Sequence, residues 1–172
     1  HDALPICSCV YAIKNYPNYF TNAGELDWAK RAQKVASRFC DLTDFIVNKL
    51  GITDIGAYLP GKAVYHPSCS LTRKLGIVNE PIALLKNVKG LELLPIHNQQ
   101  TCCGFGGTFS VKMAEISGEM VKEKVEHIEE VEPQYLIGAD VSCLLNIGGR
   151  LQREGSKIKV MHIAEVLMQG EK

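Results

Sequence analysis

Residues 91–130, LELLPIHNQQTCCGFGGTFSVKMAEISGEMVKEKVEHIEE, place an apolar run, a loop rich in cysteine and glycine, and a long helical pattern one after another. The apolar run over residues 91–96 predicts a strand. From Val111 to Ile128, apolar and small residues recur at steps of three and four, which predicts a helix of about five turns beginning near Ser110. A strand followed by a loop and a helix is the repeating unit of a parallel α/β sheet.

The segments on either side repeat this alternation of strand and helix. Further strands are predicted over residues 63–66, 135–139 and 158–162. Further helices are predicted over residues 79–88, 144–153 and 164–168. Because parallel neighbours need crossover connections, we expect an α/β fold built from βαβ units, with a mostly parallel sheet and helices on both of its faces.

The N-terminal third of the chain shows a different pattern. Residues 5–10 predict a strand, and residues 14–24 predict an irregular segment or a short helix with a loop. A helical pattern then covers residues 25–50, with a break where Thr43 could cap a second helix. Within this pattern we expect Cys40 to be a small buried apolar residue, because unpaired cysteine is among the most buried residue types.

The composition excludes several classes of protein. The 172 residues are 46% hydrophobic and 22% charged, which is ordinary for a globular domain. Nineteen basic residues balance nineteen acidic ones, so we expect no nucleic-acid partner. No apolar run approaches the roughly 18 residues of a membrane span, so we expect no direct membrane insertion. The sequence also has no phosphate-binding loop motif and no evident Ser-His-Asp or paired-carboxylate set.

Cysteine is the unusual component, with seven residues in the chain. Disulfide-dense domains are usually secreted and shorter than about 80 residues, and this chain is longer. With no export signal in the sequence, we expect a reducing compartment, the cytoplasm, where thiols serve as metal ligands or redox groups.

Four cysteines, Cys69, Cys102, Cys103 and Cys143, follow predicted strands. The carboxyl ends of parallel strands share one edge of a sheet, where α/β proteins bind ligands, so we expect the four sulfurs to meet there. Four thiolates suit zinc or an iron–sulfur cluster. Structural zinc sites usually use C-x(2–4)-C pairs, whereas neighbouring cysteines here point apart and reach different atoms of a wider cluster more easily. The pattern favours iron–sulfur and leaves zinc as an alternative.

Three glycines and one histidine accompany these cysteines as candidate cofactor-binding residues. Gly104, Gly106 and Gly107 allow positive φ and close approach of the backbone to a bulky group, and their amides could donate to the sulfides of a cluster. The simpler alternative is a glycine-rich turn with two buried thiols. His66 could bind iron, donate to a cluster sulfur, or serve only as a hydrogen-bonded structural residue.

Four motifs resemble one known family. They are YHPSC (65–69), TCCGFGGTFSVK (101–112), CLLNIGG (143–149) and HIAEVL (162–167). Together they resemble the cysteine-rich CCG domain found in heterodisulfide reductase and its relatives. The most similar branch is the lactate utilization protein A family, together with the iron–sulfur subunit of (S)-2-hydroxy-acid (glycolate) oxidase.

The resemblance implies two CCG repeats, each holding a 4Fe–4S cluster that passes electrons from an oxidised 2-hydroxy acid such as L-lactate to an acceptor. It implies that Cys69, Cys102, Cys103 and Cys143 bind the cluster of the second repeat. It also implies that Cys9 is the last ligand of the first repeat. Partners would be the other subunits of a lactate oxidation complex, including a ferredoxin-like iron–sulfur subunit.

The sequence departs from the family pattern in two respects. The fuller motif ends in Cys-x-x-Cys, but Asp140 stands three residues before Cys143, so a five-thiolate noncubane cluster does not fit. The cysteine pair of the first repeat is absent. We therefore expect a fragment of an oxidoreductase subunit that does not turn over substrate alone, with residues 1–57 ending the first repeat and residues 58–172 forming the second.

A short internal repeat agrees with this division, since SCVYAI (8–13) matches SCLLNI (142–147). Two other functions stay open at this point. One is a thiol–disulfide reductase subunit like the heterodisulfide branch, and the other is a structural zinc-binding domain that serves assembly. The purified fragment could also lack its cluster, because exposed clusters and thiolates oxidise.

Overall fold

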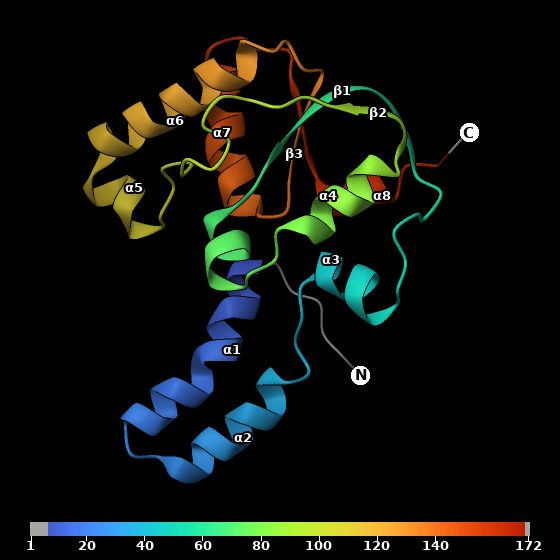
Figure 1. The fold of residues 1–172 in the computed structure, drawn as a ribbon. Coiled ribbons are helices and arrows are strands. Elements are labelled where there is room, and N and C mark those ends of the chain that lie inside the picture. The colour runs from blue at the N-terminus through green and yellow to red at the C-terminus, as the bar shows by residue number, and fades with distance from the viewer. Residues whose placement is uncertain (1–6, 171–172) are drawn as a thin grey trace.

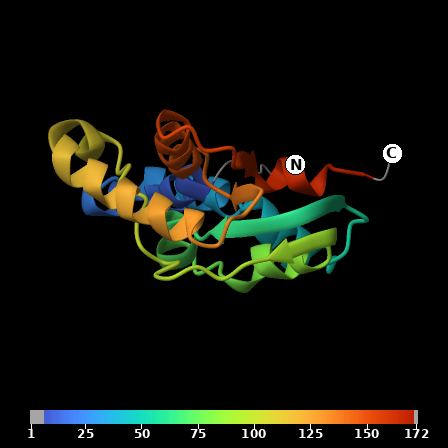
Figure 2. The same ribbon diagram turned by 90° about the horizontal axis from the view of Figure 1, so that it is seen from above.

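The computed structural model describes residues 7–170, and at its centre is a sheet of four strands, all parallel to their neighbours (Figure 1). The strands are β1 (Tyr58–His66), β2 (Lys89–Leu93), β3 (Tyr135–Gly138) and β4 (Lys159–His162). Their order across the sheet is β2-β1-β3-β4, so β1 lies between β2 and β3 (Figure 2). The predicted α/β class with a parallel sheet is confirmed.

Helices cover both faces of the sheet, and side-chain alternation along the strands explains why. On β1, Val64 faces one buried cluster of side chains, while Ala63 and Tyr65 face the other. One cluster includes side chains of α4 (Asn79–Lys86) and α8 (Ile163–Leu167). The other includes side chains of α6 (Ala114–Glu129) and α7 (Val141–Arg153), which Figure 1 shows on the opposite side of the strands. Strands buried on both faces are typical of parallel sheets.

The long helix predicted after the cysteine pair is two helices in the structure. A short helix, α5 (Thr108–Lys112), precedes α6, and Met113 between them has a non-helical backbone with φ −125° and ψ 50°. The periodicity continues across Met113 because the apolar steps resume in phase, so the pattern could not reveal the break. Strand β2 likewise ends at Leu93 rather than at residue 96, although the Leu94 N–H still donates to the Ala63 carbonyl.

The N-terminal segment corrects two predictions. Residues 7–10, expected to be a strand, begin α1 (Cys7–Asn22), while residues 5–6 of that prediction lie outside the described residues. Residues 14–22, expected to be irregular or a short helix with a loop, continue α1 despite Pro17. Packing against α2 (Leu26–Ala36) stabilises α1, and Figure 1 shows the pair extending away from the sheet.

The linker to the sheet contains two short helical segments, α3 (Leu42–Asp44) and the π-helical η1 (Phe45–Lys49). The predicted break lies here, but the N-cap is Asp41, whose side chain accepts hydrogen bonds from the N–H and hydroxyl of Thr43. Cys40 is buried as predicted, although it follows α2 instead of lying in a helix. Among the described helices, none is both long enough and apolar enough to cross a membrane.

Candidate metal centre

Three connections at the carboxyl edge of the sheet carry the four cysteines. β1 ends at His66, three residues before Cys69, and the loop after β2 carries Cys102 and Cys103. After β3, Cys143 lies in the first turn of α7. The sulfurs of Cys103 and Cys143 lie within 4.8 Å of each other, and Cys69 is near enough to Cys102 to influence its pKa. The two pairs are neighbours, because charge on Cys69 also acts on Cys143.

His66 completes a tight group of metal-binding atoms at the end of β1. One ligand atom each from His66, Cys103 and Cys143 lies within 4.8 Å of the others, and all three residues are buried. Among the described residues, neither ring nitrogen of His66 has a hydrogen-bond partner. A buried polar atom without a partner is costly, so this imidazole suits a bound group that would interact with it.

The hydrogen bond between Cys103 and Cys143 separates the acidities of the two thiols. It lowers the pKa of Cys103 and raises that of Cys143, and the nearby His66 imidazole adds to the lowering at Cys103. Burial opposes ionisation of both thiols. Cys103 is therefore the thiol that ionises first, and the thiolate is the form that binds metals.

The glycines shape the loop around the cysteine pair, but in different ways. Gly104 has φ +83°, and a Cβ there would lie 2.8 Å from the carbonyl oxygen of Ser117 on α6. Its N–H donates to Sγ of Cys102 at 3.4 Å. Gly106 and Gly107 also have positive φ but are exposed, at the turn into α5. All three glycines thus have positive φ, and close packing acts at Gly104, against Ser117, and at Gly106, where a Cβ would lie 2.8 Å from Phe109, but not at Gly107.

Asp140 and Cys7 are site residues that sequence reasoning missed. The Asp140 side chain caps α7 by accepting from the N–H and hydroxyl of Ser142. The Cys7 thiol donates to Asp140 and lies 3.4 Å from the Ser68 hydroxyl. An Asp before a helix is a recognisable cap signal. Nothing local marks Cys7, because its partners are far along the chain.

Lys124 is a third missed residue, and the sequence does hold a signal for it. Lys124 occupies the apolar stripe of α6, between Val121 and Val125, where a charged side chain is unexpected. It is fully buried, and its Nζ donates to the carbonyls of Asn98 and Gln99 in the loop before the cysteine pair.

Cys9 stands apart from the four other candidate ligands. It is exposed on α1, and no described contact links its sulfur to theirs. Residues two positions apart in a helix lie on roughly opposite sides of its axis, so Cys9 points away from buried Cys7.

Among the described cysteines, no disulfide is present. The grouped thiols and imidazole are therefore donors that suit a metal ion or an iron–sulfur group.

Comparison with known proteins identifies the same region. The family model described as "CCG: Cysteine-rich domain" matches residues 63–148. The chain is 73% identical over 164 residues to the uncharacterized protein YkgE of Escherichia coli strain K12, covering 95% of this chain and 68% of that protein. It is 58% identical over 163 residues to lactate utilization protein A of Geobacillus sp. strain WCH70, with the same coverage of both chains. Lactate utilization protein A of Bacillus velezensis is 53% identical over 163 residues, with 95% and 68% coverage. The chain therefore belongs to the CCG cysteine-rich domain family, among relatives that include lactate utilization protein A.

Proposed function

We propose that this chain carries electrons in the oxidation of L-lactate or a related 2-hydroxy acid, through a 4Fe–4S cluster bound by Cys69, Cys102, Cys103 and Cys143. The observation that carries the proposal is the approach of these thiols, from three separate strand ends, to the buried His66 imidazole, whose ring nitrogens have no hydrogen-bond partner in the part of the chain that the structure describes. The relatives named lactate utilization protein A support the substrate class.

Different residues of the chain would have different roles at such a site. A bound cluster would supply one-electron transfer. Cys103 ionises readily and would bind first, while the Gly104 N–H donates to the Cys102 sulfur and stabilises its negative charge. Cys103 and Cys143 are buried and shielded from water, whereas Cys69 and Cys102 are half-buried, and both hydrogen bonding and burial tune the potential of iron–sulfur sites.

The division into repeats is part of the proposal. Residues 1–57 would form the end of a first CCG repeat with its linking helices, and residues 58–172 the second repeat. Cys9 lies near the start of α1 as Cys143 lies near the start of α7, which supports its assignment as the last ligand of a first-repeat cluster. We assign the complete protein to the cytoplasm, with a ferredoxin-like iron–sulfur subunit among its partners in a lactate oxidation complex.

A mononuclear zinc site is the second candidate, because His66, Cys103 and Cys143 already form a three-donor group. Such a site would serve structure or assembly and would need neither Cys69 nor Cys102.

Metal analysis of anaerobically purified and reconstituted protein separates the two candidates. About four iron atoms per chain with broad visible absorption support the cluster, whereas colourless protein with one zinc supports the alternative. Cys69→Ser and Cys102→Ser should abolish iron binding but would spare a zinc site that uses only His66, Cys103 and Cys143. Cys9→Ser is the matched control and should leave the iron content of this chain unchanged. Reconstituted protein that binds no iron would overturn the proposal.

A further inference from the structure

Lys124 on α6 is the most unusual charged residue in the structure. Its side chain is fully buried, with 0% relative exposure. Lysine is almost never fully buried unless its charge is paired, because removing an ammonium group from water is costly. Its environment should therefore contain negative charge, or acquire it when the protein is functional.

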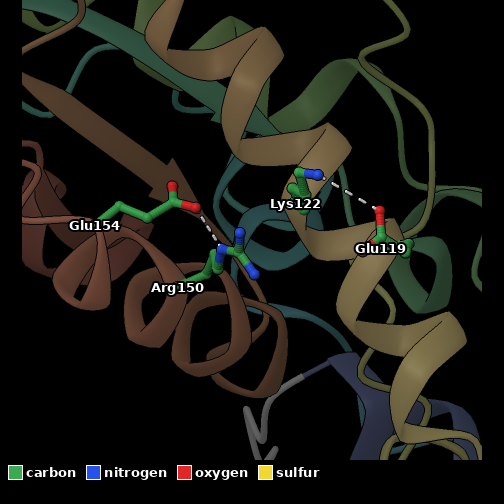
Figure 3. Close-up of polar contacts among 4 residues, drawn as sticks. All are labelled: Glu119, Lys122, Arg150 and Glu154. Carbon is green, nitrogen blue, oxygen red and sulfur yellow. Dashed lines mark hydrogen bonds and ion pairs between the residues drawn. The ribbon is translucent and has the colours of Figure 1, made fainter.

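Among the described residues, no ion pair with a carboxylate supplies that charge. Within the described part of the chain, the Lys124 Nζ donates only to the carbonyls of Asn98 and Gln99, at 3.1 and 3.0 Å. Lys122, two residues earlier, shows the ordinary arrangement: it is partly exposed and its Nζ lies 3.7 Å from a Glu119 carboxylate oxygen (Figure 3). The two lysines of one helix thus have opposite environments.

The negative charges that favour the ammonium form of Lys124 are those of the cysteine thiols and of Glu123. Burial lowers the pKa of Lys124, while negative charge on Cys103 has the largest opposing effect. Cys102 and Cys143 act in the same direction, as does Glu123, an exposed neighbour on α6. Residues flanking Lys124 on α6, Val121 and Val125, share a buried cluster with Cys103 and Cys143. Through the neighbours of Lys124, α6 therefore packs in the same buried cluster as two candidate ligands, and the ammonium group binds the loop that leads to the cysteine pair.

Lys124 also holds the loop that carries the cysteine pair. Ser117 lies seven residues, about two turns, before Lys124, so both side chains project from the same side of α6. The Ser117 hydroxyl donates to the Gly104 carbonyl at 2.8 Å, just after the cysteine pair, and Lys124 binds the loop before it. One of its acceptors, Asn98, has φ +49°, in the left-handed region that asparagine adopts more readily than most residues other than glycine. The two side chains secure the loop on both sides of the cysteine pair.

We propose that Lys124 is a positioning residue and the built-in counter-cation of the thiolate site, offsetting the negative charge that gathers when the cysteines bind metal. This inference rests on the proposed function in one respect, that the thiolates bind a metal group. The positioning role of Lys124 applies to the metal-free chain as well. The positioning role and the counter-cation role can therefore be tested separately.

The first test is titration of the anaerobically reduced chain with Co²⁺, whose thiolate complexes absorb visible light. We compare Lys124→Met, Lys124→Gln and Lys124→Arg with the wild type. A unit charge in a partly screened interior changes such an equilibrium by about tenfold or more, so Met and Gln should weaken Co²⁺ binding at least about tenfold. Arg keeps the charge and should recover most of the affinity. Lys122→Met removes a partly exposed lysine of the same helix and should stay within about twofold of the wild type.

The second test is amide hydrogen exchange over residues 97–104 in the metal-free chain. Lys124→Met should increase exchange there because two carbonyl acceptors lose their donor, and Lys124→Arg should restore protection more than Met does. Lys122→Met should not change it. Circular dichroism checks that the variants fold. If Lys124→Met does not fold, Lys124→Gln, which keeps a hydrogen-bond donor without the charge, replaces it in the comparison.

The outcomes separate a failure of the proposed function from a failure of the roles proposed for Lys124. Wild-type protein that binds neither Co²⁺ nor iron would remove the proposed function and the counter-cation role, while hydrogen exchange would still decide the positioning role. Neutral variants that bind Co²⁺ as tightly as the wild type would overturn the counter-cation role. Unchanged exchange over residues 97–104 in both neutral variants would overturn the positioning role.

Discussion

The thiol of Cys7 donates a hydrogen bond to the carboxylate of Asp140, with 3.0 Å between Sγ and Oδ2, although 133 positions separate the two residues. The same sulfur lies 3.4 Å from the hydroxyl of Ser68, the residue before Cys69. Asp140 caps the helix that carries Cys143. The first turn of α1 is therefore linked to two of the loops that present the candidate ligands.

Removing the Cys7 thiol should destabilise the chain. Cys7→Ala leaves the buried Asp140 carboxylate with one donor fewer, and a lost partner of a buried polar group costs about 1–3 kcal/mol. Urea unfolding of the metal-free, reduced chain measures the change in free energy of unfolding. The matched variant is Cys9→Ala, which alters an exposed thiol on the same helix and should stay within about 0.5 kcal/mol of the wild type. Equal effects of the two variants would contradict a structural role for the Cys7–Asp140 bond.

Stability should fall in acid partly through Asp140. Burial raises the pKa of this carboxyl group, but hydrogen bonds from Cys7 and Ser142 outweigh that effect, so its pKa lies below the usual value of about 3.9. A carboxyl group whose pKa is lowered by folding stabilises the folded state above its unfolded pKa, and this contribution is lost as pH falls through the folded pKa. Asp140→Asn should therefore be less stable at neutral pH and show a flatter loss of stability below about pH 4. Urea midpoints across that pH range test this. An acid dependence as steep as that of the wild type would assign the effect to other groups.

Two glycines of the CCGFGG loop should respond differently to alanine. At Gly104 an added Cβ would lie 2.8 Å from the Ser117 carbonyl and the backbone has φ +83°, so both a clash and backbone strain result. At Gly107 the backbone also has positive φ, but no atom lies within 4 Å of the added Cβ. Strain alone costs about 1–2 kcal/mol, and overpacking adds about 1–3 kcal/mol. Gly104→Ala should thus lower the free energy of unfolding by at least about 1 kcal/mol more than Gly107→Ala does. Equal losses would show that the loop yields freely at α6.

Metal should stabilise the folded chain through the grouped thiols. A ligand that binds only the folded state at 100 times its dissociation constant adds about 2.7 kcal/mol. Anaerobically loaded protein should therefore melt at a higher temperature than the same protein treated with a chelator. Cys103→Ser removes the most acidic thiol of the site and should abolish the difference. A shift that persists in Cys103→Ser would place the metal elsewhere on the chain.

Much of the sheet was predictable from sequence because its signals are local. The strand and helix positions after residue 58 follow from runs of apolar residues that end at glycine or polar residues, and each predicted strand overlaps an observed one. Parallel order then places Cys69 and Cys143 at one edge of the sheet, since each follows a neighbouring strand. The resemblance to the CCG family also rests on short local segments, which are the cysteine motifs that follow these strands.

Other features depended on contacts between distant parts of the chain. Residues 7–10 resemble a strand in composition, yet they form a helix, because Cys7 is buried against Asp140 and Ser68 and α1 packs on α2. Lys124 stands out in the apolar stripe of α6, but its acceptors lie in a loop more than twenty residues earlier.

The amino-acid sequence by itself thus determined the α/β class, the parallel sheet and the edge at which the cysteines gather, because these follow from hydrophobic periodicity and strand direction. Only the tertiary structure decided the helical state of the N-terminal segment, the grouping of His66 with Cys103 and Cys143, and the burial of Lys124. Each of these requires side chains from separate elements to come within a few ångströms of one another, and no local pattern encodes such a distance.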